Sequence, residues 1–119
     1  MKSIEQQKLR TVLNDFVAEC RNTFSDKLCD VRLFGSYARG DHNEESDIDI
    51  MVILNMGDAE VRKDRQDVCR IAAMLELKHR VTISPVLYGK EEYDARKTFG
   101  FCKNVDKEGV SQYAGQSYA

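Results

Sequence analysis

The chain has 119 residues, 42% of them hydrophobic, and a formal net charge of −2 at pH 7. Length and composition predict one soluble globular domain spanning residues 1–119 and exclude a disordered chain. The near-neutral charge excludes a broad attraction to nucleic-acid backbones, so nucleic acid is not expected as a direct ligand.

The first half of the chain predicts one helix and two strands. Apolar residues recur at helical spacing from Ile4 to Phe24, with Ser3 as the N-cap. The short apolar segment Asp30–Phe34 predicts a strand that stops at Gly35. The β-branched, almost wholly apolar run Ile48–Leu54 predicts a central strand covered on both faces.

An amphipathic helix and a third strand come next. Residues Val61, Val68, Ala72 and Leu75 give the segment 59–79 a helical apolar stripe. The segment 81–88 returns to strand character, and its proline places it at a sheet edge or beside a bulge.

The remaining residues carry weaker patterns. The run 90–99 predicts a short helix, and 101–107 predicts another that ends near Gly109. Residues 110–119 are weakly patterned and are expected to fray. The order of elements predicts a small α/β (α+β) domain, a mixed sheet flanked by helices.

The cysteines and the N-terminus bear on the compartment. Cys20, Cys29, Cys69 and Cys102 are widely spaced and form no CxxC pair, which favours reduced thiols over a disulfide framework or a zinc site. The opening MKSIEQQKLR lacks the apolar core of a signal peptide, and no run approaches membrane-spanning length. We therefore expect a cytoplasmic protein that does not contact membranes.

Two aspartates open the central strand. Residues two apart in a strand point to the same face, so Asp47 and Asp49 are expected to project together. Their proximity raises the free energy of ionising both. A Mg²⁺ ion relieves that repulsion, because it is typically held by one or two carboxylates, water and substrate phosphates. The pair is therefore a candidate metal site.

A turn before the acidic loop offers a complementary phosphate site. Gly35 permits close backbone approach to a ligand, and Ser36 is placed to cap a short helix whose free N–H groups face an anion. Arg39 follows one turn later and can neutralise phosphate charge, although a surface pairing with Glu44 or Glu45 is an equal alternative. Gly40 is expected to end the turn.

The spacing Gly35-Ser36, ten residues, then Asp47-Ile48-Asp49 resembles the GS-x10-DxD signature of the DNA polymerase beta nucleotidyltransferase superfamily. Most of the chain, as far as KNVDKEG at 103–109, resembles the minimal nucleotidyltransferase (MNT) domains, which often pair with a HEPN-domain protein. The resemblance implies a polymerase beta-like fold and transfer of a nucleoside monophosphate, AMP by preference, from ATP or another NTP to a hydroxyl. Asp47 and Asp49 would hold Mg²⁺, and Gly35 and Ser36 would contact the phosphates.

One feature of the superfamily pattern is missing. A third carboxylate normally comes from a later strand, but here that strand carries Thr82 and Ser84 where an acid is expected. Glu91 or Glu92, beyond the strand, is a further alternative. Two hypotheses follow: an active transferase with an unusual third ligand, or a nucleotide- and metal-binding domain that acts through its partner.

The resemblance also implies a partner. The chain resembles the antitoxin half of a HEPN/MNT toxin–antitoxin pair, in which transfer to the toxin or direct binding neutralises it, and it lacks the Arg-x4-6-His motif of the toxin half. Antibiotic nucleotidyltransferases share the signature but add a second domain, for which this length leaves little room. The acceptor, the base preference and a homo-oligomer are left open. His42 and His79 are interpreted as surface residues, not as metal ligands.

Overall fold

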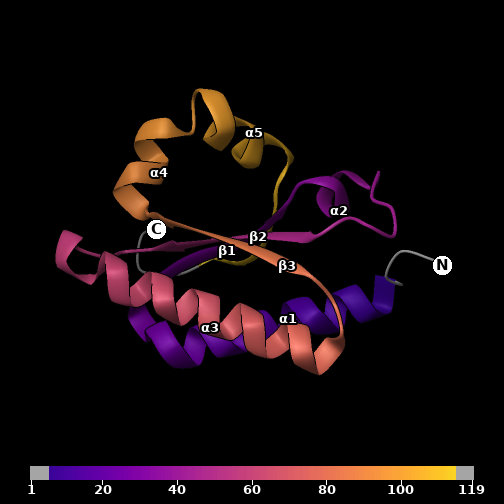
Figure 1. The fold of residues 1–119 in the computed structure, drawn as a ribbon. Helices are drawn as coiled ribbons and strands as arrows, with labels where there is room; N and C mark the ends of the chain where they lie inside the picture. The colour runs from indigo at the N-terminus through magenta and orange to yellow at the C-terminus, as the bar shows by residue number, and fades with distance from the viewer. Residues whose placement is uncertain (1–5, 115–119) are drawn as a thin grey trace.

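The computed structural model describes residues 6–114, which form a four-stranded sheet with helices on both faces (Figure 1). The helices are α1 (Gln6–Phe24), α2 (Ser36–Arg39), α3 (Val61–His79), α4 (Lys90–Arg96) and α5 (Gly100–Glu108), with 3-10 turns η1 (Ser25–Lys27) and η2 (Asp58–Glu60). The strands are β1 (Leu28–Phe34), β2 (Ile48–Leu54), β3 (Ile83–Gly89) and β4 (Val110–Ala114). Within this range, no helix combines the length and the apolar character needed to cross a membrane.

The sheet is mixed, with the strand order β3-β2-β1-β4. Strand β1 is antiparallel to both of its neighbours, whereas β2 and β3 are parallel. The chain crosses from β2 to β3 through α3, because parallel strands need a long crossover connection. The predicted α/β (α+β) class and the mixed sheet flanked by helices are confirmed.

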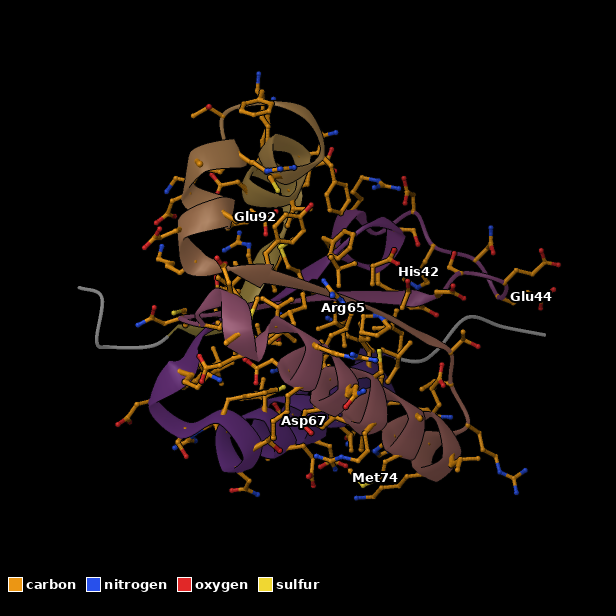
Figure 2. All side chains as sticks on the ribbon, turned by 60° about the vertical axis from the view of Figure 1, so that its left-hand side comes forward. His42, Glu44, Arg65, Asp67, Met74 and Glu92 are labelled. Atoms are coloured by element: carbon orange, nitrogen blue, oxygen red, sulfur yellow. The ribbon has the colours of Figure 1, made fainter. Side chains whose placement is uncertain are left out.

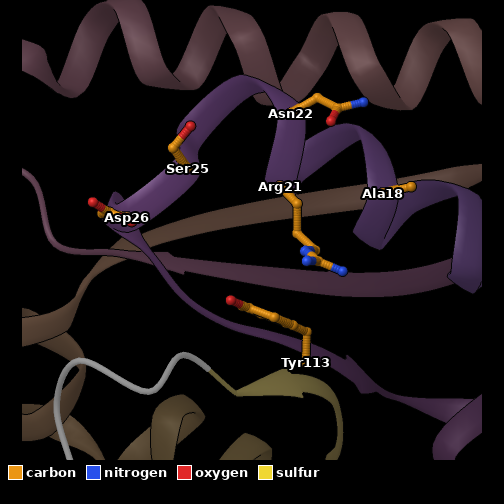
Figure 3. A pocket seen from close by; sticks show the side chains of 6 residues that line it. All are labelled: Ala18, Arg21, Asn22, Ser25, Asp26 and Tyr113. Atoms are coloured by element: carbon orange, nitrogen blue, oxygen red, sulfur yellow. The ribbon is translucent and has the colours of Figure 1, made fainter.

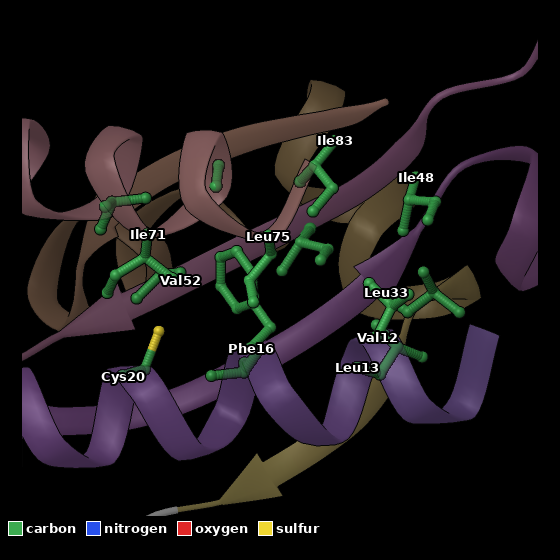
Figure 4. Packing of buried hydrophobic residues seen from close by; sticks show 14 of the residues in the cluster. Val12, Leu13, Phe16, Cys20, Leu33, Ile48, Val52, Ile71, Leu75 and Ile83 are labelled. Carbon is green, nitrogen blue, oxygen red and sulfur yellow. The ribbon is translucent and has the colours of Figure 1, made fainter. Parts of the chain in front are cut away.

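Strand β2 is buried on both faces, as its apolar run predicts. Ile48 and Val52 pack in a core shared with α1 and α3 (Figure 4). Met51 and Ile53 point the other way, into a smaller core shared with α4 and α5. Because side chains alternate along a strand, Asp49 lies on the α4–α5 face. It is therefore a polar group at the end of an otherwise apolar strand.

Strand β3 is an edge strand, as its proline predicts. The Thr82 carbonyl accepts a bond from the N–H of Ile48, so by alternation the backbone groups of Ile83 and Pro85 face away from the sheet. The outward N–H of Ile83 donates to Glu76 Oε2 on α3 at 2.8 Å, and Pro85 has no N–H to expose. This edge is thereby protected from pairing with another strand.

The remaining predicted elements agree with the structure apart from their ends. The segment 59–79 forms η2 and α3, the run 90–99 contains α4, and α5 covers 101–107 and is followed by Gly109. Strand β1 begins at Leu28, before the predicted start. The predicted helix start at Ser3 and Ile4 lies outside the described residues.

The prediction for the C-terminal segment was wrong for residues 110–114, which form β4 and do not fray. This strand pairs with the edge of β1 that β2 leaves free, where Val31 lies opposite Tyr113. Strand β1 supplies the backbone partners that a strand requires, and β4 has no strong apolar pattern of its own. Pairing between segments so far apart in the chain leaves no local signal in the sequence. Residues 115–119 lie outside the described range.

We expect Phe16→Ala to lower the free energy of unfolding by about 3–5 kcal/mol, because the ring is fully buried between α1 and the sheet and its loss leaves a cavity. Leu77→Ala is the matched control, since this α3 side chain is 83% exposed and its loss should change stability by less than about 0.5 kcal/mol. Urea unfolding followed by circular dichroism measures both. Equal losses would contradict this placement of the core.

Candidate active site

The two candidate aspartates stand at the entrance to β2. Asp47 is exposed and directly precedes the strand, and Asp49, half-buried, is its second residue. Burial raises the pKa of the Asp49 carboxyl, the negative charge of Asp47 raises it further, and Arg39 acts in the opposite direction. The structure thus brings Asp47, Asp49 and Arg39 close enough for their charges to interact.

Gly35 lies directly against Asp49. Strand β1 ends at Phe34, which pairs with Asp49, and the next residue turns sharply with φ 74° and ψ −155°. This backbone conformation is essentially restricted to glycine. A Cβ atom at this position would overlap Oδ2 of Asp49. The position therefore requires glycine for two independent reasons.

The turn that follows is the short helix α2. Its N-cap is Gly35, not Ser36 as the sequence predicts, because the N–H groups of Ala38 and Arg39 both donate to the Gly35 carbonyl at 3.0 Å. Ser36 is the first helical residue. Gly40 ends the turn in the left-handed region with φ 83°, as predicted. The first N–H groups of such a turn have no carbonyl acceptor within it and are available to an anion.

Arg39 has partners that the sequence did not indicate. Its Nε lies 3.1 Å from Asp41 Oδ2, and its Nη1 lies 3.6 Å from Glu108 Oε2 at the end of α5. These two carboxylates, and not Glu44 or Glu45 as in the alternative, are the ones that the structure places against Arg39. Asp41 is only two residues from Arg39, so the sequence offered it as a partner. Glu108 is far from Arg39 in the chain, and only tertiary packing brings the two together.

The position expected for a third carboxylate is occupied by a serine. In the register of β2 and β3, Ser84 lies beside Asp49, and exposed Thr82 precedes β3. Glu91 and Glu92 follow the far end of β3, where Gly89 pairs with Leu54, so they cannot join Asp49 as the alternative required. Figure 2 shows Glu92 on α4, well apart from the loop that carries Glu44.

The described residues include no group of three or more His, Cys, Asp or Glu side chains arranged to hold a metal ion. Two carboxylates beside a phosphate-accessible turn nevertheless fit a Mg²⁺ ion whose other ligands are water and substrate phosphates. The site can therefore bind a cation together with an anionic substrate, and it has no closed metal cage made by the protein alone.

The two histidines, which the sequence analysis interprets as surface residues, are each partly exposed and each contact a neighbouring side chain. The His42 ring stacks on Tyr37, with centroids 4.0 Å apart. His79 Nε2 on α3 lies 2.8 Å from Asp15 Oδ2 on α1. Hydrogen bonds from Lys78 and His79 hold the pKa of Asp15 below its ordinary value. Both contacts are structural.

The cysteines are free thiols, in agreement with the sequence analysis. Cys20, Cys29 and Cys102 are buried, and Cys69 is exposed. Burial raises the pKa of Cys20 to about 12, which leaves this thiol unreactive.

A pocket of about 460 Å³ lies elsewhere, between α1, η1 and β4 (Figure 3). Its lining residues include Arg21, whose guanidinium sits 5.6 Å from the ring centre of Tyr113, and Asp26. Neither of the paired aspartates nor the Gly-Ser turn contributes to it. The volume of this pocket therefore does not identify it as the candidate active site.

Comparison with known proteins identifies the family of this chain. A family model described as a nucleotidyltransferase domain matches residues 13–107. The chain is 38% identical over 79 residues to "Putative protein adenylyltransferase MJ0141" of Methanocaldococcus jannaschii, which covers 66% of this chain and 78% of that protein.

Two solved structures share the fold. A protein from Sulfolobus solfataricus described as a "putative nucleotidyltransferase" has a TM-score of 0.62 and 24% identity, over 92% of this chain and 85% of that chain. A chain from the complex of the tri-AMPylated Shewanella oneidensis HEPN toxin with MNT antitoxin has a TM-score of 0.57 and 20% identity, over 92% of this chain and 75% of that chain.

Gly35→Ala should lower the free energy of unfolding by about 3 kcal/mol or more, because it combines backbone strain with overlap of the Asp49 carboxylate. Gly40→Ala is the control with a positive φ but open space around it, and it should cost about 1 kcal/mol. The double variant Gly35→Ala/Asp49→Ala should lose at least about 1 kcal/mol less free energy of unfolding than the sum of the two single variants, because Asp49→Ala removes the overlapping carboxylate. Strictly additive losses in urea unfolding would argue against the contact.

Asp49→Asn should stabilise the metal-free protein at pH 7. Because the folded-state pKa of Asp49 is raised, ionising this carboxyl disfavours folding above the ordinary aspartate pKa of 3.8, and the penalty disappears below it. We expect a gain on the order of 0.5 kcal/mol, reduced by solvent screening at this half-buried site, which shrinks as the pH falls to 4. Urea unfolding at both pH values, with Asp58→Asn at an exposed position as control, tests this. A loss of stability at pH 7 would refute it.

Proposed function

The chain belongs to the nucleotidyltransferase domain family, and we propose that it transfers AMP from ATP to a hydroxyl group of a partner protein. The observation that carries this proposal is the contact of Gly35 with Asp49, which joins a phosphate-accessible turn to a pair of carboxylates. The name of the M. jannaschii relative, an adenylyltransferase acting on protein, supports both the nucleotide and the kind of acceptor.

In this proposal Asp47 and Asp49 hold Mg²⁺. When bound, the ion would supply charge neutralisation for the triphosphate. Burial and, after it, the negative charge of Asp47 raise the pKa of Asp49, so a bound cation would favour the ionised form of this carboxyl. Ser84 can offer a hydroxyl beside this pair but no further negative charge.

The Gly-Ser turn and Arg39 bind the phosphates. Gly35 turns the chain over Asp49 without a Cβ that would displace the carboxylate, and the first N–H groups of α2 donate to the phosphate oxygens. Arg39 is held by Asp41 and Glu108 and is 43% exposed, so its guanidinium can exchange these partners for phosphate oxygens.

The transfer itself is a substitution at the α-phosphorus of ATP. The acceptor hydroxyl oxygen forms a bond to this phosphorus, the bond to the bridging oxygen of the β-phosphate breaks, and pyrophosphate leaves. The hydroxyl proton passes to solvent, because Ser84 occupies the position where a third carboxylate would accept it. Turnover is therefore expected to be slow.

We further propose that the acceptor is a HEPN-domain toxin. The AMPylated toxin in the S. oneidensis complex, one of whose chains shares this fold, supports this partner. A second candidate function, neutralisation of the partner by direct binding without transfer, is favoured by the absence of an acid at Thr82 and Ser84.

The test incubates the protein with Mg²⁺, ATP labelled at the α-phosphate and a purified HEPN-domain protein from the same organism. We expect label on the HEPN protein and at least about a hundredfold less label with Asp47→Asn or Asp49→Asn, because each removes a charge from the site. Asp58→Asn, in η2 beyond the other end of β2, is the matched control and should retain labelling.

Three outcomes separate the candidates. Labelling that survives both aspartate variants would refute the assigned roles. Absent labelling, with the partner's activity still suppressed by the Asp47→Asn/Asp49→Asn double variant, would favour the binding function. Neither labelling nor suppression would refute both.

A further inference from the structure

A second pocket opens beside the Gly-Ser turn, with a volume of about 210 Å³. It is lined by Phe34, Gly35, Arg39, Phe101, Asn104, Val105 and Glu108. Gly35 and Arg39 belong to the turn that binds phosphate in the proposed function, whereas the last four residues come from α5, and of these only Glu108 takes part in that function, through Arg39. The volume is below the roughly 300–1,000 Å³ of pockets that enclose drug-sized ligands, and it suits one flat ring system.

The aromatic wall of this pocket is held in place. The Phe101 ring meets Phe34 edge-on, with centroids 5.5 Å apart, and is inclined by 29° to the Tyr88 ring, with centroids 6.4 Å apart. These contacts orient the ring, yet Phe101 remains 47% exposed. An oriented aromatic ring with an open surface is a stacking platform for a planar ligand.

The polar side chains of the pocket favour an uncharged ring over a phosphate at the α5 end. Glu108 places a carboxylate at the rim, 3.6 Å from Arg39, so a second anion at the α5 end would be repelled. Groups with N–H or O–H donors are compatible with it. Asn104 contributes an amide that both donates and accepts hydrogen bonds. The phosphates therefore belong at the turn and an uncharged ring at α5.

Helix α5 is fixed to the sheet. Arg32 on β1 donates from Nη2 to the Gly109 carbonyl at 2.9 Å, and Tyr93 on α4 donates to Asp106 Oδ1 at 3.0 Å. Arg32 is itself paired with Asp30 at 3.1 Å. The α5 wall of the pocket is thus part of the rigid fold, as a selective site requires.

We propose that this pocket takes the nucleobase of the substrate, with Phe101 stacking on the ring and the Asn104 amide selecting adenine through its amino and ring-nitrogen edge. The inference rests on the proposed function, because the triphosphate at the turn carries the base to α5. It assigns base recognition to α5 of this chain, a segment outside the Gly-Ser and Asp-x-Asp motifs.

The test compares ATP with inorganic tripolyphosphate, which has phosphates but no base, by calorimetric titration in Mg²⁺. Phe101→Ala should weaken ATP binding about tenfold through lost stacking and leave tripolyphosphate binding unchanged. Phe99→Ala is the matched control, because this neighbouring phenylalanine is 61% exposed and does not line the pocket. Equal ATP affinities for the Phe101→Ala and Phe99→Ala variants would overturn the assignment.

Asn104→Leu provides a second variant of similar shape at an exposed position. The ratio of ATP to GTP affinity should fall about tenfold, with tripolyphosphate binding unchanged. An unchanged ratio would overturn the role of the amide. Failure of the wild-type protein to bind either ATP or tripolyphosphate would instead refute the proposed function, and the base pocket with it.

Discussion

The contact between the Gly35 backbone and the Asp49 carboxylate is the constraint on which the site depends. It arises because Phe34, at the end of β1, pairs with Asp49 near the start of β2, so the chain leaving β1 must turn directly over the carboxylate. Only a residue without a side chain can make that turn. The turn leads directly into helix α2, which carries Arg39, and Gly35 and Arg39 line the pocket against α5. The burial of β2 on both faces keeps the carboxylate in place beneath the turn.

The acidic side chains of the candidate site have different neighbours from the buried acidic side chains elsewhere in the fold. Buried Asp64 is paired with Lys27 at 2.8 Å, and buried Asp30 accepts a bond from Ser111 at 2.6 Å beside Arg32. These carboxylates have cationic or hydroxyl partners supplied by the fold. Asp49 instead lies near a second carboxylate, and its pKa is raised. In the proposed function an external cation, together with Arg39, neutralises Asp49 and its neighbour Asp47.

The two faces of the sheet differ in the helices that cover them and in the size of the core that they bury. Helices α1 and α3 cover one face and contribute most of the core, whereas α4 and α5 cover the other face, on which Asp49 lies (Figure 1). Ser84, beside Asp49, limits the negative charge that the chain can provide for transfer. In the proposed function the turn and the aspartates bind the triphosphate, and the hydroxyl proton passes to solvent because Ser84 is not a base. More residues of the candidate site therefore support nucleotide binding than support rapid transfer.

The sequence by itself determined the local elements and the motif. The apolar runs predicted α1, β2 and α3, and Pro85 predicted an edge strand, because each is a short-range pattern. The spacing of Gly35, Asp47 and Asp49 likewise predicted a candidate site, and the structure brings these residues together. Tertiary structure alone decided β4, the pairing of Arg39 with Glu108, and the place of α5 beside the turn. Each of these joins segments far apart in the chain, and such contacts form only after the sheet has brought the segments together, so no local pattern records them.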